Sequence, residues 1–175
     1  MTQQKKAYIF AAIAVLFWST APTSFKITLR YLSITEMLFY SSLTAAIAIL
    51  LIIIFQGKTK EIFSSGSKEI IYSAILGLMN PFLYYIILFK AYTLLPAQVA
   101  QPLNFIWPIM IVILSIPILK QKIPVKSLLA ILVSFVGVLL ISTKGKIFNL
   151  NIEEPYGVFL ALVSSIVWAL FFIIN

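Results

Sequence analysis

The chain has 175 residues, of which 62% are hydrophobic and only 10% charged, and its mean hydropathy is +1.07. A soluble domain averages about 25% charged residues, so the composition predicts an all-α, polytopic membrane protein. The net charge of +8 does not indicate a nucleic-acid partner, because the basic residues lie singly between apolar runs. The sequence contains no Cys and no His, which excludes disulfides and thiolate or histidine metal sites, and we expect no cofactor.

Six apolar segments have the length of membrane spans, which need about 20 helical residues. We predict transmembrane helices at residues 7–29, 37–55, 70–89, 97–119, 125–142 and 155–175. Pro22 predicts a kink in the first helix. Lys90 marks the predicted end of the third helix, and a tight turn follows because Pro96 disfavours helix in the residue before it. The third and fourth helices should therefore form an antiparallel hairpin.

Polar residues recur at helical spacing in both arms of this hairpin. In the third helix Gly77, Asn80 and Tyr84 are predicted to share one face. In the fourth, Gln98, Gln101 and Asn104 follow at every third position, with Pro108 four residues further on. Polar side chains at bilayer depth are costly and usually face a bundle interior or a wet cavity. Two hypotheses follow: a polar wall of a substrate pathway, or a polar seam that only holds helices together.

Basic residues are unequally divided between the two predicted membrane faces. Eight lie at one set of alternate helix ends and five at the other, which accounts for all 13 Lys and Arg. Basic residues are enriched in cytoplasmic loops, so the N terminus is predicted to be cytoplasmic.

The first and sixth predicted helices are alike. Residues 11–19 resemble residues 161–169, and Trp18 and Trp168 occupy equivalent places at an offset of 150. An odd-numbered unit of five spans would put its second copy upside down in the membrane, which is the inverted-repeat design of many secondary transporters.

Residues 77–142 resemble the EamA repeat of the drug/metabolite transporter superfamily. The matching features are small residues, turns and helix ends, namely Gly77, Phe89-Lys90-Ala91-Tyr92, Ala97, Ala100, Pro108, Lys120-Gln121-Lys122 and Gly137-Val138-Leu139-Leu140. The run Asn104-Phe105-Ile106-Trp107-Pro108 is similar to aromatic amino acid exporters within that family. Two positions depart from the family pattern: Gln121 stands where a Glu is frequent, and Ser41 where an Arg is frequent.

The resemblance implies ten helices in two inverted five-helix repeats, placed in a prokaryotic plasma (inner) membrane and moving small metabolites outward. Residues 1–146 would be the first repeat and residues 155–175 the first helix of the second. On this interpretation the chain is truncated after that helix. The rest of the bundle would come from a missing half or from a homodimer partner.

The candidate substrate-binding residues combine aromatic rings with carboxamides. They are Trp18, Asn80, Tyr84, Gln98, Gln101, Asn104, Trp107 and Trp168. A carboxamide offers donors and an acceptor to the ammonium and carboxylate of a zwitterion, and aromatic rings can stack on an apolar side chain or a cation. The alternatives are interfacial packing for each Trp and structural roles at the proline breaks for Asn80 and Asn104.

The leading functional prediction is export of small-molecule metabolites by alternating access, with amino acids, including aromatic ones, as substrates. The five carboxylates lie at helix ends or in loops, which disfavours a membrane hydrolase and carboxylate-based proton coupling. We therefore expect no enzymatic activity. The alternatives are a non-transporting membrane subunit or half-transporter that needs a partner chain, and a multidrug exporter, which usually needs a membrane-embedded acid.

Overall fold

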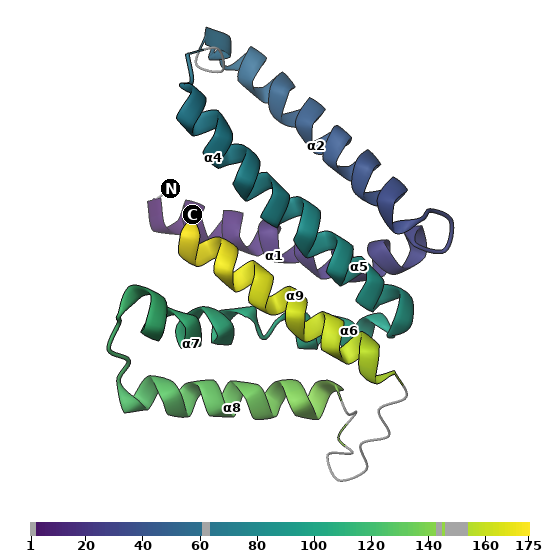
Figure 1. Ribbon diagram of the computed structural model, residues 1–175, viewed down its shortest axis with the longest axis vertical. Helices are drawn as coiled ribbons and strands as arrows, with labels where there is room; N and C mark the ends of the chain where they lie inside the picture. The colour runs from purple at the N-terminus through teal and green to yellow at the C-terminus, as the bar shows by residue number, and fades with distance from the viewer. Residues whose placement is uncertain (1–2, 61–63, 143–144, 146–153) are drawn as a thin grey trace.

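The computed structural model describes residues 3–60, 64–142, 145 and 154–175, and these residues form a helical bundle (Figure 1). The elements are α1 (Gln3–Thr28), α2 (Ile34–Phe55), α4 (Ser67–Gly77), η1 (Leu78–Leu83), α5 (Tyr84–Leu94), α6 (Ala97–Asn104), α7 (Trp107–Leu119), α8 (Val125–Ser142) and α9 (Pro155–Ile174). No strand occurs within these described ranges, and the predicted all-α class is confirmed.

Five continuous or kinked helices have the length and composition of membrane spans. They cover Gln3–Thr28, Ile34–Phe55, Ser67–Leu94, Ala97–Leu119 and Pro155–Ile174, and they correspond to five of the six predicted spans. The remaining one, α8, has a shorter apolar stretch, Val125–Val138, so a sixth crossing stays a prediction. Helix directions alternate along the chain, and α1 and α9 therefore run in opposite directions (Figure 1).

The third span differs from the prediction at both its middle and its end. Asn80 has extended backbone angles, φ −145° and ψ 118°, because a following proline disfavours the helical region. This break resets the helical phase, so the predicted common face of Gly77, Asn80 and Tyr84 was wrong. The predicted end at Lys90 was also wrong, since α5 continues to Leu94 and leaves only a short turn before α6.

The fourth span is divided into two helices. Helix α6 ends at Asn104, and α7 begins at Trp107 with Pro108 in its first turn. Proline lacks the N–H that would continue the hydrogen-bond ladder, and its ring suits the start of a helix. The break therefore lies within the Asn104–Pro108 run and places this run beside the candidate site described below.

Helix α9 packs in the centre of the bundle, against α5, α6 and α7. Small residues recur at every fourth position on its buried side, namely Gly157, Ala161, Ser165 and Ala169. Such a stripe lets helix backbones approach closely in a membrane. A Cβ added at Gly157 would lie 2.8 Å from Leu95 Cγ, which shows how closely α9 approaches the end of α5.

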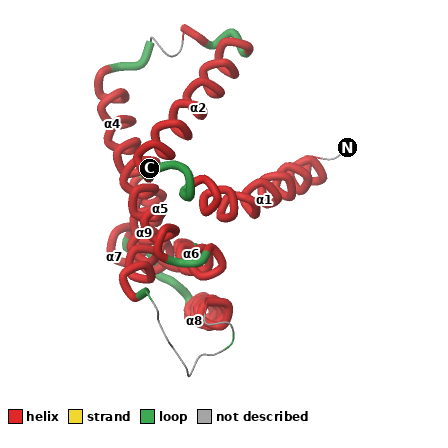
Figure 2. The backbone as a smooth tube through the Cα atoms, turned by 90° about the vertical axis from the view of Figure 1, so that its right-hand side faces the viewer, coloured by secondary structure: helices red, strands yellow, loops and turns green. Residues whose placement is uncertain are grey.

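Helix α1 stands away from the other helices over most of its length (Figure 2), and Pro22 is its one buried residue. Its C-terminal part is attached to α5. The Phe25 ring lies edge-on to Phe89 at 5.1 Å between centroids. The Lys26 ammonium donates hydrogen bonds to the carbonyls of Tyr92 and Leu95, the latter at 2.8 Å. Lys26 therefore caps the C-terminal end of α5, where a cation is favourable.

Candidate substrate-binding site

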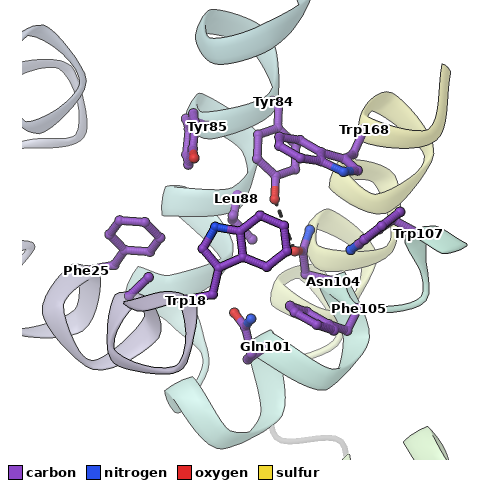
Figure 3. A pocket seen from close by; sticks show the side chains of 11 residues that line it. Trp18, Phe25, Tyr84, Tyr85, Leu88, Gln101, Asn104, Phe105, Trp107 and Trp168 are labelled. Carbon is purple, nitrogen blue, oxygen red and sulfur yellow. Dashed lines mark hydrogen bonds between the residues drawn. The ribbon is translucent and has the colours of Figure 1, made fainter. Parts of the chain in front are cut away.

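A cavity of about 110 Å³ lies between α1, α5, α9 and the break that separates α6 from α7 (Figure 3). Its lining is Trp18, Ala21, Phe25, Tyr84, Tyr85, Leu88, Gln101, Asn104, Phe105, Trp107 and Trp168. An engineered apolar cavity of about 150 Å³ accepts benzene. The present cavity therefore admits several waters or a group somewhat smaller than a benzene ring, and a larger molecule would extend beyond it.

A chain of buried hydrogen bonds forms the inner wall of the cavity. The Tyr84 hydroxyl donates to Asn104 Oδ1 at 3.1 Å (Figure 3). The Asn104 amide donates to the Ser164 hydroxyl at 2.9 Å, and Ser164 donates to the carbonyl of Ala161 at 2.7 Å. Tyr84, Asn104 and Ser164 are all buried. This chain satisfies polar groups that would otherwise be costly to bury, and it links α5, α6 and α9.

A second hydrogen bond orients the other carboxamide of the cavity. The hydroxyl of Tyr92 donates to Gln101 Oε1, and Tyr92 itself is completely buried. Because Lys26 binds the backbone carbonyl of Tyr92, α1 and α5 together fix the position of this phenol. The Gln101 amide is therefore held with its carbonyl engaged.

Aromatic rings form most of the rest of the cavity wall. The Trp168 ring lies against Tyr84 with centroids 4.5 Å apart, and Trp107 stacks on Phe172 at 5.7 Å. The indole N–H of Trp168 is buried and has no hydrogen-bond partner among the described residues. Unpaired buried N–H groups are uncommon in folded proteins. Because this N–H is buried, it is a donor that only a rearranged state of the site would pair.

None of the described residues that line the cavity is charged. Two of the Glu residues cap helices instead: Glu36 accepts a hydrogen bond from the backbone N–H of Ser33, and Glu69 accepts one from that of Gly66. Glu61 and Glu153 lie outside the described residues. No group of metal-ligating side chains occurs in the part of the chain that the structure describes. The site can therefore bind through neutral hydrogen bonds, aromatic faces and shape.

The structure gathers six of the eight predicted site residues around this cavity, namely Trp18, Tyr84, Gln101, Asn104, Trp107 and Trp168. Their role in binding stays a prediction. Gln98 lies outside and is exposed. Residues three apart on a helix differ by about 60° in direction, so Gln98 is turned about 120° from Asn104. Asn80 is also outside, because the break at Pro81 separates it from the face that carries Tyr84.

Five lining residues were not predicted: Ala21, Phe25, Tyr85, Leu88 and Phe105. Two of them were recoverable from the sequence, because Ala21 and Phe25 lie three and seven residues after Trp18 and so share its helix face. Ser164, which completes the hydrogen-bond chain, was also missed. Ser164 is one of two adjacent serines in an apolar helix, and a hydroxyl there gives no signal of its partner.

Comparison with known proteins identifies the family. The model of the EamA-like transporter family matches residues 5–143. The chain belongs to this family. The match extends from α1 to the end of α8 and leaves α9 outside.

Two curated relatives are similar over almost the whole chain. An uncharacterized transporter of Archaeoglobus fulgidus is 29% identical over 168 residues, covering 95% of this chain and 56% of the relative. An uncharacterized transporter of Clostridium kluyveri is 26% identical over 175 residues, covering 98% of this chain and 56% of the relative. The EamA chain described here thus spans little more than half the length of these relatives. No solved structure matches it at a significant level.

Together, the family match and the apolar helices make this a membrane-embedded, multi-pass member of the EamA-like transporter family. The surroundings of its apolar helices are accordingly a lipid bilayer.

Proposed function

We propose that this EamA chain forms part of an exporter of amino acids and similar small metabolites, working by alternating access in a prokaryotic inner membrane. The observation that carries the proposal is the cavity, which joins aromatic faces to two oriented carboxamides and has no charged side chain among its described lining residues. A zwitterion suits such a site, because its two charges need no net counter-charge from the protein. Its ammonium can lie on the rings and its carboxylate can accept hydrogen bonds.

The aromatic amino acids are the narrower candidates, on the resemblance of the Asn104-Phe105-Ile106-Trp107-Pro108 run. An aromatic substrate side chain would extend past the cavity volume of about 110 Å³. We therefore propose that further helices complete the site, contributed either by a longer chain or by a second subunit. The greater length of both relatives supports this part of the proposal.

A multidrug exporter of lipophilic cations is the competing function. The rings of Trp18, Tyr84 and Trp107 favour a cation, whereas the absence of any carboxylate among the lining residues disfavours one. The two functions differ in their response to ethidium, which only the multidrug exporter would remove from cells.

The test is an efflux assay. Cells that express the protein are loaded with a panel of amino acids, and internal levels are compared with those of cells carrying an empty vector. We expect lower internal levels of at least one amino acid and no effect on ethidium. Trp18→Ala should raise the half-saturating concentration by about two- to twelvefold, which corresponds to a lost aromatic contact of roughly 0.5–1.5 kcal/mol.

Phe17→Ala is the matched control, because Phe17 is the neighbouring aromatic residue on α1. Phe17 and Trp18 are both exposed, at 73% and 60%, but only Trp18 lines the cavity. Both variants should reach the membrane in wild-type amounts, since neither ring is part of the packed interior. Unchanged efflux of every amino acid in the panel would refute the proposed substrate class. Equal effects of the two variants would refute the proposed site.

A further inference from the structure

The unengaged polar groups of the cavity are mainly N–H donors. Each of the two carboxamide oxygens already accepts a hydrogen bond from a tyrosine hydroxyl. Asn104 Oδ1 accepts it from Tyr84, and Gln101 Oε1 accepts it from Tyr92. A carboxamide nitrogen carries two donors. No described residue accepts a hydrogen bond from Gln101 Nε2, and Asn104 Nδ2 makes one bond, to Ser164.

The tryptophans add to this excess of donors. An indole has one N–H donor and no acceptor, and none of the three indoles donates to another described residue. One of them, the N–H of Trp168, is fully buried without a partner. In Figure 3 Asn104 is drawn beside the Trp18 ring and Gln101 below it, with Trp107 and Trp168 on the Asn104 side.

Donors without acceptors discriminate between the two ends of an amino acid. A carboxylate accepts several hydrogen bonds and makes the stronger, charge-assisted kind with them. A primary ammonium has only donors and would be opposed by the N–H groups of Gln101. The acceptors left for it are the Tyr85 hydroxyl and the second lone pairs of oxygens that already accept a hydrogen bond. The aromatic faces and the Tyr85 hydroxyl are the surfaces that favour an ammonium among the described lining residues, and the donors outnumber these acceptors.

We propose that this cavity receives the carboxylate of its substrate and that Gln101 is the residue that determines this preference. Tyr92 is the positioning residue, because its hydroxyl occupies the Gln101 carbonyl and turns the amide nitrogen into the cavity. Lys26 supports Tyr92 through its backbone carbonyl. The inference rests on the proposed function and narrows it, since it requires a substrate with a carboxylate and gives the ammonium a secondary role.

The chain offers a direct readout of ligand binding in this cavity. It contains three tryptophans, and all three line the cavity. Tryptophan emission, excited where tyrosine and phenyl rings do not absorb, therefore reports only on this site. We would titrate the purified full chain in lipid nanodiscs with leucine, with 3-methylbutylamine, which lacks the carboxylate, and with 4-methylpentanoate, which lacks the ammonium. The corresponding phenylalanine set would be measured in parallel.

The wild-type protein should bind the zwitterion and the acid, and it should bind the amine at least about tenfold more weakly, the value expected for losing a hydrogen bond to a charged group. Gln101→Glu should reverse this order. The new carboxylate still accepts the Tyr92 hydroxyl, so the local packing is kept, but it replaces the amide donors by an acceptor. Gln98→Glu places the same charge on the same helix at an exposed position and should leave the order unchanged.

Tyr92→Phe provides a second, independent test. It frees the Gln101 carbonyl and allows the amide to rotate, so the difference between acid and amine should shrink while the zwitterion still binds. A general loss of structure would instead weaken all three ligands together.

Two outcomes overturn the inference. Equal binding of amine and acid by the wild-type protein would show that the cavity does not select a carboxylate. An unchanged order in Gln101→Glu would show that Gln101 does not set the preference. In both cases binding of the zwitterion leaves the proposed function standing. If neither zwitterion changes the emission, the amino acid function itself fails and the inference fails with it.

Discussion

Replacing Asn104 by Ala should destabilise the protein, because Asn104 is the middle of the hydrogen-bond chain from Tyr84 to Ser164. The substitution removes the bonds at 3.1 Å and 2.9 Å and leaves the Tyr84 hydroxyl buried without its acceptor. Hydrogen bonds between membrane helices contribute about 0.6 kcal/mol each on average. A stranded buried donor costs a further 1–3 kcal/mol or so. We therefore expect the free energy of unfolding to fall by about 2–4 kcal/mol.

Tyr84→Phe separates these two contributions. In the Asn104→Ala background it removes the stranded hydroxyl, so the double variant should be more stable than the sum of the two single effects by about 1 kcal/mol. The assay is reversible unfolding in mixed micelles of increasing SDS content, followed by tryptophan emission. Gln98→Ala is the control, since Gln98 is exposed on the same helix and its loss should change the free energy by less than about 0.5 kcal/mol.

The reasoning would be refuted if Asn104→Ala destabilised no more than Gln98→Ala. It would also be refuted if the effects of Asn104→Ala and Tyr84→Phe were simply additive, because a direct hydrogen bond between the two side chains requires coupling.

Three further predictions concern the packing and orientation of the helices. Lys26→Met should lower the free energy of unfolding by about 1–2 kcal/mol in the SDS assay, because two backbone carbonyls lose a charged donor. Lys90→Met is the control and should have little effect, because Lys90 is exposed. Gly157→Ala should lower the free energy of unfolding by about 1–3 kcal/mol, because the new methyl group overpacks against Leu95. Gly77→Ala is the control: its new Cβ meets nothing within 4 Å, so the free energy should stay unchanged or rise by up to about 1 kcal/mol. Equal effects of the two variants would argue against the close α5–α9 contact. A green fluorescent protein joined to the N terminus should fluoresce in the cytoplasm, and an alkaline phosphatase joined there should be inactive; the opposite pair of results would reverse the predicted orientation.

Residues that carry an energetic cost in a membrane were predictable from the sequence. Asn104, Gln101 and Tyr84 are expensive to place in lipid, so their appearance in apolar segments already indicated an interior site. The break before α7 follows from the missing N–H of Pro108. These local rules need no knowledge of the partner helices.

Features that depend on helix phase and on distant partners were not predictable. The three-residue spacing of Gln98, Gln101 and Asn104 suggested one face, but drift along the helix and the packing of α6 left Gln98 outside. Lys26 finds its acceptors 66 and 69 residues away, and Ser164 binds Asn104 across 60 residues. Such contacts arise only when the helices pack, so a single sequence does not reveal them.

The most direct test of the central claim is to locate the bound substrate. A photoreactive leucine analogue with a diazirine in its side chain would be bound to the full protein in nanodiscs and activated by light, and the labelled residues would be read by mass spectrometry. We predict labels on α1 near Trp18 and on the Gln101–Trp107 segment, and we expect excess unlabelled leucine to remove them. Labels confined to helices α2 and α8, which contribute no lining residue to the cavity, or labels that leucine does not displace, would contradict the assignment of this cavity as the substrate site.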